Sequence, residues 1–144
     1  MCLILSYNPE TRVANTDIIC YKLVVKKANG IYNSLYRKFE YIIRRNYKIP
    51  EIEKCILKEN RYGVKILEEG AFHSFVREVD AFIDYQEQAN ILISNYHFPM
   101  ILSIVKCAIP KGAIYYMGST NSMLSYASSQ IKILEEIWID LRNL

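Results

Sequence analysis

The chain of 144 residues has no long apolar stretch and no segment dominated by glycine, serine or proline. Its apolar runs at residues 18–25 and 101–105 are interrupted by Lys22 and Ser103, whereas a membrane span needs roughly 20 apolar residues. The first residues also lack the basic start and the apolar run of a secretory signal. We therefore expect a cytoplasmic protein without membrane contact, folded as a single domain over residues 1–144.

Motifs that mark common enzyme classes and metal sites are also lacking. No glycine-rich phosphate loop, HExxH or GxSxG motif occurs. The two histidines, His73 and His97, are far apart, and the cysteines are scattered without a CxxC pair. We predict no metal, no cofactor, and reduced cysteines that pack as small apolar residues. The four cysteines are Cys2, Cys20, Cys55 and Cys107.

Tyrosine is frequent, with 12 residues against a single tryptophan. A tyrosine ring is large and apolar, but its hydroxyl needs a hydrogen-bond partner. An excess is therefore typical either of half-buried strands or of binding surfaces. The balance of 51% hydrophobic and 23% charged residues is that of an ordinary globular domain with a buried core. Composition alone does not decide between the two uses of tyrosine.

Hydrophobic alternation and turn residues predict a fold built mainly from strands. Residues 17–27 alternate between two faces and are rich in β-branched and aromatic residues. Asn29 and Gly30 then form a turn, because both tolerate positive φ. Further extended segments are predicted at residues 31–43, 51–58, 62–67, 101–109 and 113–117. We expect these segments to form a mostly antiparallel sheet.

One segment predicts an amphipathic helix, over residues 75–87. Apolar residues recur at helical spacing from Phe75 onward, and Ser74 precedes them as a candidate N-cap. The tail at residues 123–141 has a helical stripe, yet residues 130–134 alternate as in a strand. Periodicity therefore leaves a C-terminal helix open. We predict a single α+β domain in which the helix packs on the sheet.

Basic residues concentrate in one part of the chain, although the net charge is only +3. The segment from Lys22 to Lys48 carries one acid, Glu40, and its cations are interleaved with aromatic residues. Cations that bind phosphate and rings that stack on bases are what a nucleotide site needs. The alternative is a solvated strand face above buried tyrosines. The cations are Lys22, Lys26, Lys27, Arg37, Lys38, Arg44, Arg45 and Lys48.

No helix-turn-helix or other duplex-binding motif accompanies these cations. A small anionic ligand is therefore the more economical functional interpretation. The segment before the predicted helix suggests a second anion contact, because His73 and Ser74 come where free backbone N–H groups and the helix dipole favour negative charge. The alternative is that Ser74 only caps the helix while His73 bonds a local carbonyl.

Four segments of the chain resemble segments of known proteins. They read DIICYKLV at residues 17–24, GAFHSF at 70–75, VKCAIPKGAIYY at 105–116 and SYASSQIKIL at 125–134. Taken in order, they resemble small uncharacterised proteins of gut bacteria and their phages. The order is also similar to that of a reduced ADP-ribosyltransferase-like fold. In that fold a first strand carries a cation, a Ser-rich strand leads into a helix, and a late strand bears a catalytic glutamate.

The sequence departs from that family where the glutamate belongs, because residues 127–130 read ASSQ. Without the carboxylate, transferase chemistry would lose its main electrostatic contribution. The resemblance thus implies a module that binds a small anionic nucleotide-like ligand without catalysis. In a phage, such a module would sequester a nucleotide immune signal of the host. The predicted ligand-binding residues are Lys22, Tyr36, Arg37, His73, Ser74, Lys111 and Tyr116.

Each of these residues has an expected role. Arg37 and Lys111 are assigned to phosphates. Tyr36 and Tyr116 are assigned to base stacking. Lys22 is included because the resemblance implies a cation near its position in the first strand.

Two other functions stay open. Glu135 or Glu136 could replace the missing carboxylate, which would make the chain an active ADP-ribosyltransferase-like enzyme. Alternatively, the tyrosines and arginines form the interface of a protein-interaction or inhibitor module. The sequence does not decide whether the protein forms a homo-oligomer.

Overall fold

The computed structural model describes residues 3–5, 10–35, 39–49, 57–59, 61–67, 71–95 and 101–138. Within these ranges the chain forms thirteen strands and one helix, α1 (Glu78–Asn95). The strands are β1 (Leu3–Ile4), β2 (Arg12–Val13), β3 (Ile18–Ala28), β4 (Ile31–Ser34), β5 (Glu40–Ile42), β6 (Asn46–Lys48), β7 (Leu57–Glu59), β8 (Lys65–Leu67), β9 (Phe72–Phe75), β10 (Leu102–Ile109), β11 (Ile114–Thr120), β12 (Met123–Ser128) and β13 (Gln130–Ile137).

The strands form one sheet in which neighbours pair antiparallel. Its main path runs β6-β13-β10-β3-β9-β12-β11-β1-β8-β7, while β4 and β5 branch from β3, and β2 pairs with β11. The predicted α+β fold with a mostly antiparallel sheet is confirmed. The predicted strands at 17–27, 101–109 and 113–117 correspond to β3, β10 and β11.

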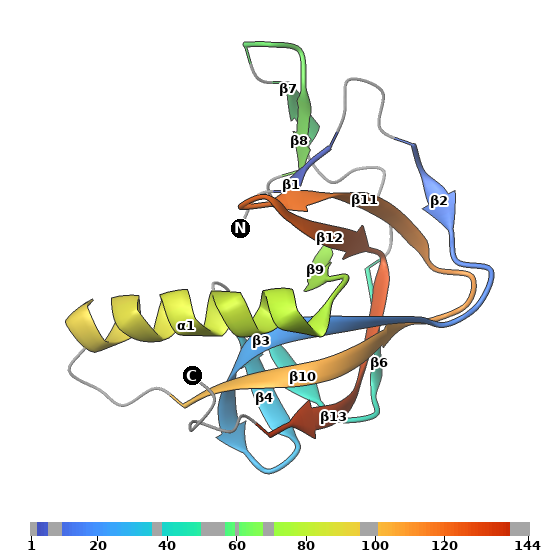
Figure 1. Ribbon diagram of the computed structural model, residues 1–144. Helices are drawn as coiled ribbons and strands as arrows, with labels where there is room; N and C mark the ends of the chain where they lie inside the picture. Colours follow the sequence, from blue (N-terminus) through green and yellow to red (C-terminus); the bar gives the residue numbers. More distant parts are fainter. Residues whose placement is uncertain are drawn as a thin grey trace.

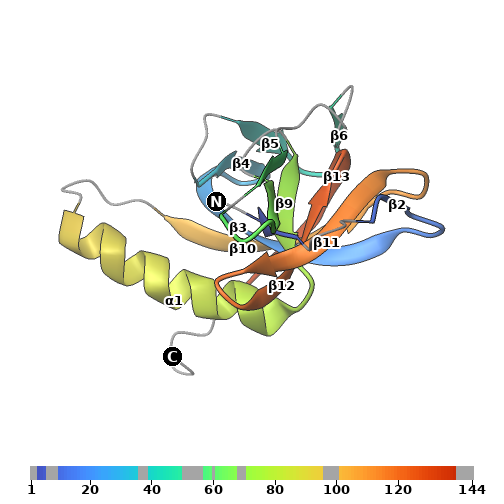
Figure 2. The ribbon, with the colours of Figure 1, turned by 90° about the horizontal axis from the view of Figure 1, so that it is seen from above.

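Six strands of the sheet lie around a ring, in which a turn takes the place of pairing between β5 and β6 (Figure 1, Figure 2). Strand β3 pairs with β4, β4 with β5, β6 with β13, β13 with β10, and β10 again with β3. A turn joins β5 directly to β6. There, Arg44 has a positive φ of 66° and donates its backbone N–H to the carbonyl of Ile133 at 2.8 Å. This ring defines an inner face, which is packed, and an outer face.

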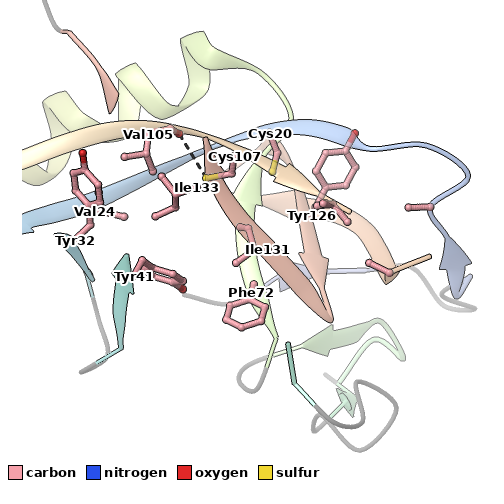
Figure 3. Packing of buried hydrophobic residues seen from close by; sticks show 13 residues of the cluster. Cys20, Val24, Tyr32, Tyr41, Phe72, Val105, Cys107, Tyr126, Ile131 and Ile133 are labelled. Atoms are coloured by element: carbon pink, nitrogen blue, oxygen red, sulfur yellow. Dashed lines mark hydrogen bonds between the residues drawn. The ribbon is translucent and has the colours of Figure 1, made fainter. Parts of the chain in front are cut away.

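The ring encloses the largest of three apolar clusters in the described part of the chain (Figure 3). Aromatic rings meet within it, with Tyr41 and Tyr47 centroids 5.4 Å apart and Tyr41 and Phe72 centroids 6.2 Å apart. Cys20 and Cys107 face each other across β3 and β10, and both are fully buried free thiols, as predicted. Cys2 and Cys55 lie outside the described residues.

Helix α1 lies against β3 and β10 on the outer side of the ring (Figure 2). Ala81 is fully buried there in a cluster with Leu23, Phe75 and Ile104. The helix begins at Glu78 and ends at Asn95, so the predicted bounds of 75–87 were wrong at both ends.

The predicted start of the helix was wrong because the segment before Glu78 includes a strand. Residues Phe72–Phe75 form β9, in which Ser74 lies opposite Tyr126 of β12. Pairing with a strand more than 50 residues away overrides the local helical spacing. Ser74 is therefore no N-cap.

The tail is also extended. Residues 123–128 and 130–137 form β12 and β13, so the C-terminal helix left open by the sequence is excluded for this stretch. The alternation of Ile131 and Ile133 was the correct signal, since both side chains are fully buried in the ring. Pairing of β12 with β11 and of β13 with β10 decides the conformation.

Across the described ranges, no helix is both long and apolar enough to cross a membrane.

Candidate anion-binding surface

Five of the seven predicted ligand-binding residues lie in the described part of the chain, whereas Tyr36 and Arg37 lie outside it. Lys22 lies on the inner side of β3, where its Nζ donates to the carbonyl of His73 at 2.6 Å. The same Nζ is 5.7 Å from the ring centroid of Tyr41. The structure thus brings Lys22, His73 and Ser74 together, but it joins them through contacts within the core.

His73 and Ser74 do not form a helix mouth. Both belong to β9, and their side chains point to opposite faces of the sheet. Ser74 is 4% exposed and faces the ring interior beside Cys20. A hydrogen bond with Cys107 lowers the pKa of the Cys20 thiol against the opposing effect of burial, and the Ser74 hydroxyl and the Lys22 charge lower this pKa further. The residues therefore form an internal polar cluster.

The remaining two predicted residues have different surroundings. Lys111 is exposed in the turn between β10 and β11, and its backbone N–H donates to Asp17 Oδ1 at 2.8 Å. Tyr116 is 5% exposed in a cluster with Leu3 and Leu67, and its hydroxyl accepts a hydrogen bond from Thr11 at 3.3 Å. Its ring is part of the core and does not lie beside Lys111.

Tyr32 and Tyr41, two tyrosines of the basic segment in the described part of the chain, are inside the ring. Tyr32 is 1% exposed and Tyr41 is 3% exposed. For these rings the structure agrees with the alternative of buried tyrosines under a solvated face. These two rings are therefore not available to stack on a ligand.

Lys26 is the second lysine on the inner side of β3, and it binds a carboxylate. Its Nζ is 3.0 Å from Glu136 Oε2, which also accepts a hydrogen bond from the Tyr32 hydroxyl at 3.1 Å. The Ser103 hydroxyl donates to Glu136 Oε1 at 2.7 Å. Partial burial favours the neutral acid, but these donors and the Lys26 charge outweigh it and lower the pKa of Glu136. Glu136 is thus held as a carboxylate with both oxygens occupied.

The other glutamate of the enzyme alternative is on the outer face. Glu135 Oε1 is 4.0 Å from Lys106 Nζ, and the Glu135 side chain is 64% exposed. Neighbouring glutamates in one strand thus have different environments. A bulge between Lys106 and Cys107 shifts the register of β10 against β13 and places Glu136 opposite Val105, on the inner side.

A group of cations lies on the outer side of the ring and in the exposed turn before β6, and we call it the basic face. Tyr47, Ile131 and Ile133 point inward, so the alternating residues of β6 and β13 point outward. Lys132 lies opposite Asn46, and Lys48 lies opposite Gln130. The members of the basic face are Arg44, Arg45, Lys48, Lys106 and Lys132.

Four of these cations have no carboxylate partner. Arg44, Arg45 and Lys48 are exposed, Lys132 is half-buried, and none of the four makes an ion pair in the described structure. Elsewhere, Lys26, Lys27 and Arg77 are each paired. Positive charge on the basic face is thus left available to an anion from solution.

The sequence pointed to only part of this surface. Arg44, Arg45 and Lys48 belong to the predicted basic segment, whereas Lys132 comes from the tail, more than 80 residues later. The sequence did contain a sign that Lys132 points outward, because Lys132 stands between two isoleucines, Ile131 and Ile133, that point inward. It became useful only once the tail was known to be a strand beside β6.

Comparisons with known proteins add no functional information: no protein-family model matches the chain, and no curated protein or solved structure is significantly similar to it. The described residues contain no group of three or more side chains suited to hold a metal ion.

Proposed function

We propose that the protein binds a small, anionic, nucleotide-like ligand on the basic face without changing it chemically. The observation that carries this proposal is a set of four cations, Arg44, Arg45, Lys48 and Lys132, that have no ion-pair partner within the described part of the chain. Phosphate groups suit such a set, because arginine and lysine donate several charge-assisted hydrogen bonds.

Sheet geometry supports a compact ligand. Lys132 and Lys48 lie on neighbouring strands, which are about 4.8 Å apart, and successive outward residues along one strand are about 7 Å apart. One ligand with two or three phosphates can therefore contact both lysines at once. Arg44 and Arg45 lie at the turn that precedes β6 and extend the positive charge from there.

Binding without chemistry is proposed because the carboxylates near this surface already have partners. Glu135 lies beside Lys106, and both oxygens of Glu136 accept hydrogen bonds on the inner side of the ring. In the phage setting that the sequence resemblance implies, the bound molecule would be a nucleotide immune signal and the effect would be sequestration.

The test is a titration with ATP, ADP-ribose and a cyclic dinucleotide at low salt, followed by mass spectrometry of each ligand. We expect at least one to bind and to be recovered intact. We also expect Lys48→Gln with Lys132→Gln to weaken that binding about tenfold, since each exposed ion pair contributes up to about 1 kcal/mol.

A matched control separates position from net charge. Arg12→Gln with Lys27→Gln removes the same charge from cations that have carboxylate partners away from the basic face. This control should change affinity less than threefold. Equal losses in both double variants, or no binding by any of the three ligands, would contradict the proposal, and a cleaved ligand would instead favour the enzyme alternative.

A further inference from the structure

Two side-chain amides lie between the lysines of the basic face. The register of β6 against β13 places Asn46 opposite Lys132 and Lys48 opposite Gln130. All four side chains point outward, because they alternate with inward-facing residues of the same two strands. In this block of four, the amides occupy one diagonal and the lysines occupy the other.

The two amides are joined by a hydrogen bond and keep further donors. Asn46 Nδ2 donates to Gln130 Oε1 at 3.1 Å, in an exposed position. Two primary amides carry four N–H donors, and one is used in this bond, so three remain. Asn46 is exposed and Gln130 is half-buried, and within the described ranges neither amide makes another side-chain hydrogen bond. The remaining donors are therefore open to a ligand from solution.

The lysines add positive charge on both sides of the amide bond. Diagonal neighbours on adjacent antiparallel strands have Cβ atoms about 7–8 Å apart, within reach of long side chains. Each ammonium group carries three donors on a flexible four-carbon stem, so Lys48 and Lys132 can both turn toward a group that lies over the amides. An acceptor at this place would meet donors from the amides below it and from a lysine on either side.

This donor set suits a terminal phosphate group. A phosphate monoester carries a charge of about −1.5 to −2 at neutral pH and has three strong acceptor oxygens. A phosphodiester, as in a cyclic dinucleotide, is esterified twice and keeps two free oxygens and a single charge. The terminal group can use the amides and both ammonium groups at once, whereas the diester leaves part of the donor set without an acceptor.

We propose that Asn46 and Gln130, flanked by Lys48 and Lys132, bind a terminal phosphate group and make the basic face selective for nucleotides that end in one. This inference rests on the proposed function and chooses among its ligands, because linear phosphorylated nucleotides should bind more tightly than cyclic ones. The amides contribute hydrogen bonds without charge, so their effect on affinity is separable from the attraction by the lysines.

The experiment compares two ligands with the same bases, linear pApA, which has a 5′-terminal phosphate, and cyclic di-AMP, which has only phosphodiesters. The wild-type protein should bind pApA at least about five times more tightly, the effect of one additional ion contact at an exposed site. Gln130→Met keeps the length and the neutral charge of the side chain but removes the amide, and it should reduce this preference to less than about twofold. Asn46→Leu should act in the same direction.

Gln86→Met is the matched control, because Gln86 is an exposed glutamine on α1, away from the basic face. It should leave the preference for pApA intact. A preference that comes from net charge alone would survive both amide substitutions, and that result would overturn this inference.

Equal affinity of the wild-type protein for pApA and cyclic di-AMP would also overturn it, while the basic face still binds nucleotides. Failure of ATP, pApA and cyclic di-AMP to bind would overturn the proposed function and this inference together. Circular dichroism of each variant shows that the sheet is retained.

Discussion

Two groups of basic residues lie on the same ring of strands but have opposite surroundings. Lys22 and Lys26 lie on the inner side of β3, and each ammonium group has a fixed acceptor, the His73 carbonyl or the Glu136 carboxylate. Lys48 and Lys132 lie on the outer side of the same ring and have no carboxylate partner among the residues that the structure describes. The difference follows from strand alternation, which sends successive side chains to opposite faces.

The comparison separates stability from binding. A cation removed from water costs free energy unless a partner replaces the lost hydration, so the inner lysines belong to the packing of the core. An exposed cation keeps its hydration and contributes little to folding, so it can exchange water for a ligand. Substitutions should therefore affect unfolding on the inner side and ligand affinity on the outer side.

The largest effect is expected at Lys22. Lys22→Ala removes the donor to the His73 carbonyl and the aliphatic stem that packs inside the ring, which should lower the free energy of unfolding by about 3 kcal/mol. Urea unfolding followed by circular dichroism measures this loss. Lys27→Ala, at an exposed neighbouring position, should cost less than about 0.5 kcal/mol. Similar losses in the two variants would contradict an internal role for Lys22.

A somewhat smaller effect is expected at Glu136. Glu136→Gln leaves Lys26 without a counter-charge in a partly buried site and should cost about 2 kcal/mol at neutral pH.

The pH dependence has a defined sign. Because the folded protein lowers the pKa of Glu136, its stabilising effect is complete above the pKa of the unfolded chain and is lost as pH falls through the folded pKa. The difference in the free energy of unfolding between the wild-type protein and Glu136→Gln should therefore disappear at acid pH. A difference in the free energy of unfolding that stays constant from neutral to acid pH would show that the charge of Glu136 is not its cause.

The next largest loss of stability is expected for a substitution of Tyr32. Burial, together with the hydrogen bond and the charge of Glu136, raises the pKa of Tyr32 to about 12, so its hydroxyl remains a donor throughout the neutral range. Tyr32→Phe removes that donor and should cost about 1 kcal/mol, measured by the same unfolding assay. In the Glu136→Gln background the cost should differ, because the two groups share one hydrogen bond. Strictly additive losses would argue against that coupling.

The smallest effect on folding is expected on the basic face. Lys48→Gln should change the free energy of unfolding by less than about 0.5 kcal/mol, because the side chain is exposed and unpaired. The same variant should still weaken binding of the ligand identified by titration, and the weakening should shrink as salt screens the charge. A loss of stability above 1 kcal/mol would place Lys48 with the inner group and break the comparison.

Sequence patterns predicted the strongly alternating strands and missed the elements that depend on distant partners. β3 and β10 were identifiable because each is a long, mostly apolar stretch with β-branched residues and is followed by turn residues. β9 was mistaken for the start of the helix, since its four residues fit either period and only pairing with β12 distinguishes them. For the same reason His73 and Ser74 were predicted to lie at the start of the helix. In the structure they belong to β9, and the helix begins at Glu78.

As with the strands, the sequence predicted only part of the candidate site. The basic segment between Lys22 and Lys48 is visible in the sequence, but its division into inner and outer cations depends on which face of each strand is packed. Lys132 entered the site only because β13 lies between β6 and β10. The predicted stacking residue Tyr116 is a core residue, since its ring packs in a cluster with Leu3 and Leu67, which lie far from it in the sequence.

The sequence by itself determined that the chain forms strands with one packed face, that Cys20 and Cys107 pack as small apolar residues, and that one segment is rich in cations. These properties are local, because composition and a period of two residues act within a few residues of each position. The tertiary structure alone decided which cations have partners, which glutamate is held inside, and where Lys132 lies. Those outcomes depend on register between strands far apart in the chain, where a shift of one residue exchanges the inner and outer faces.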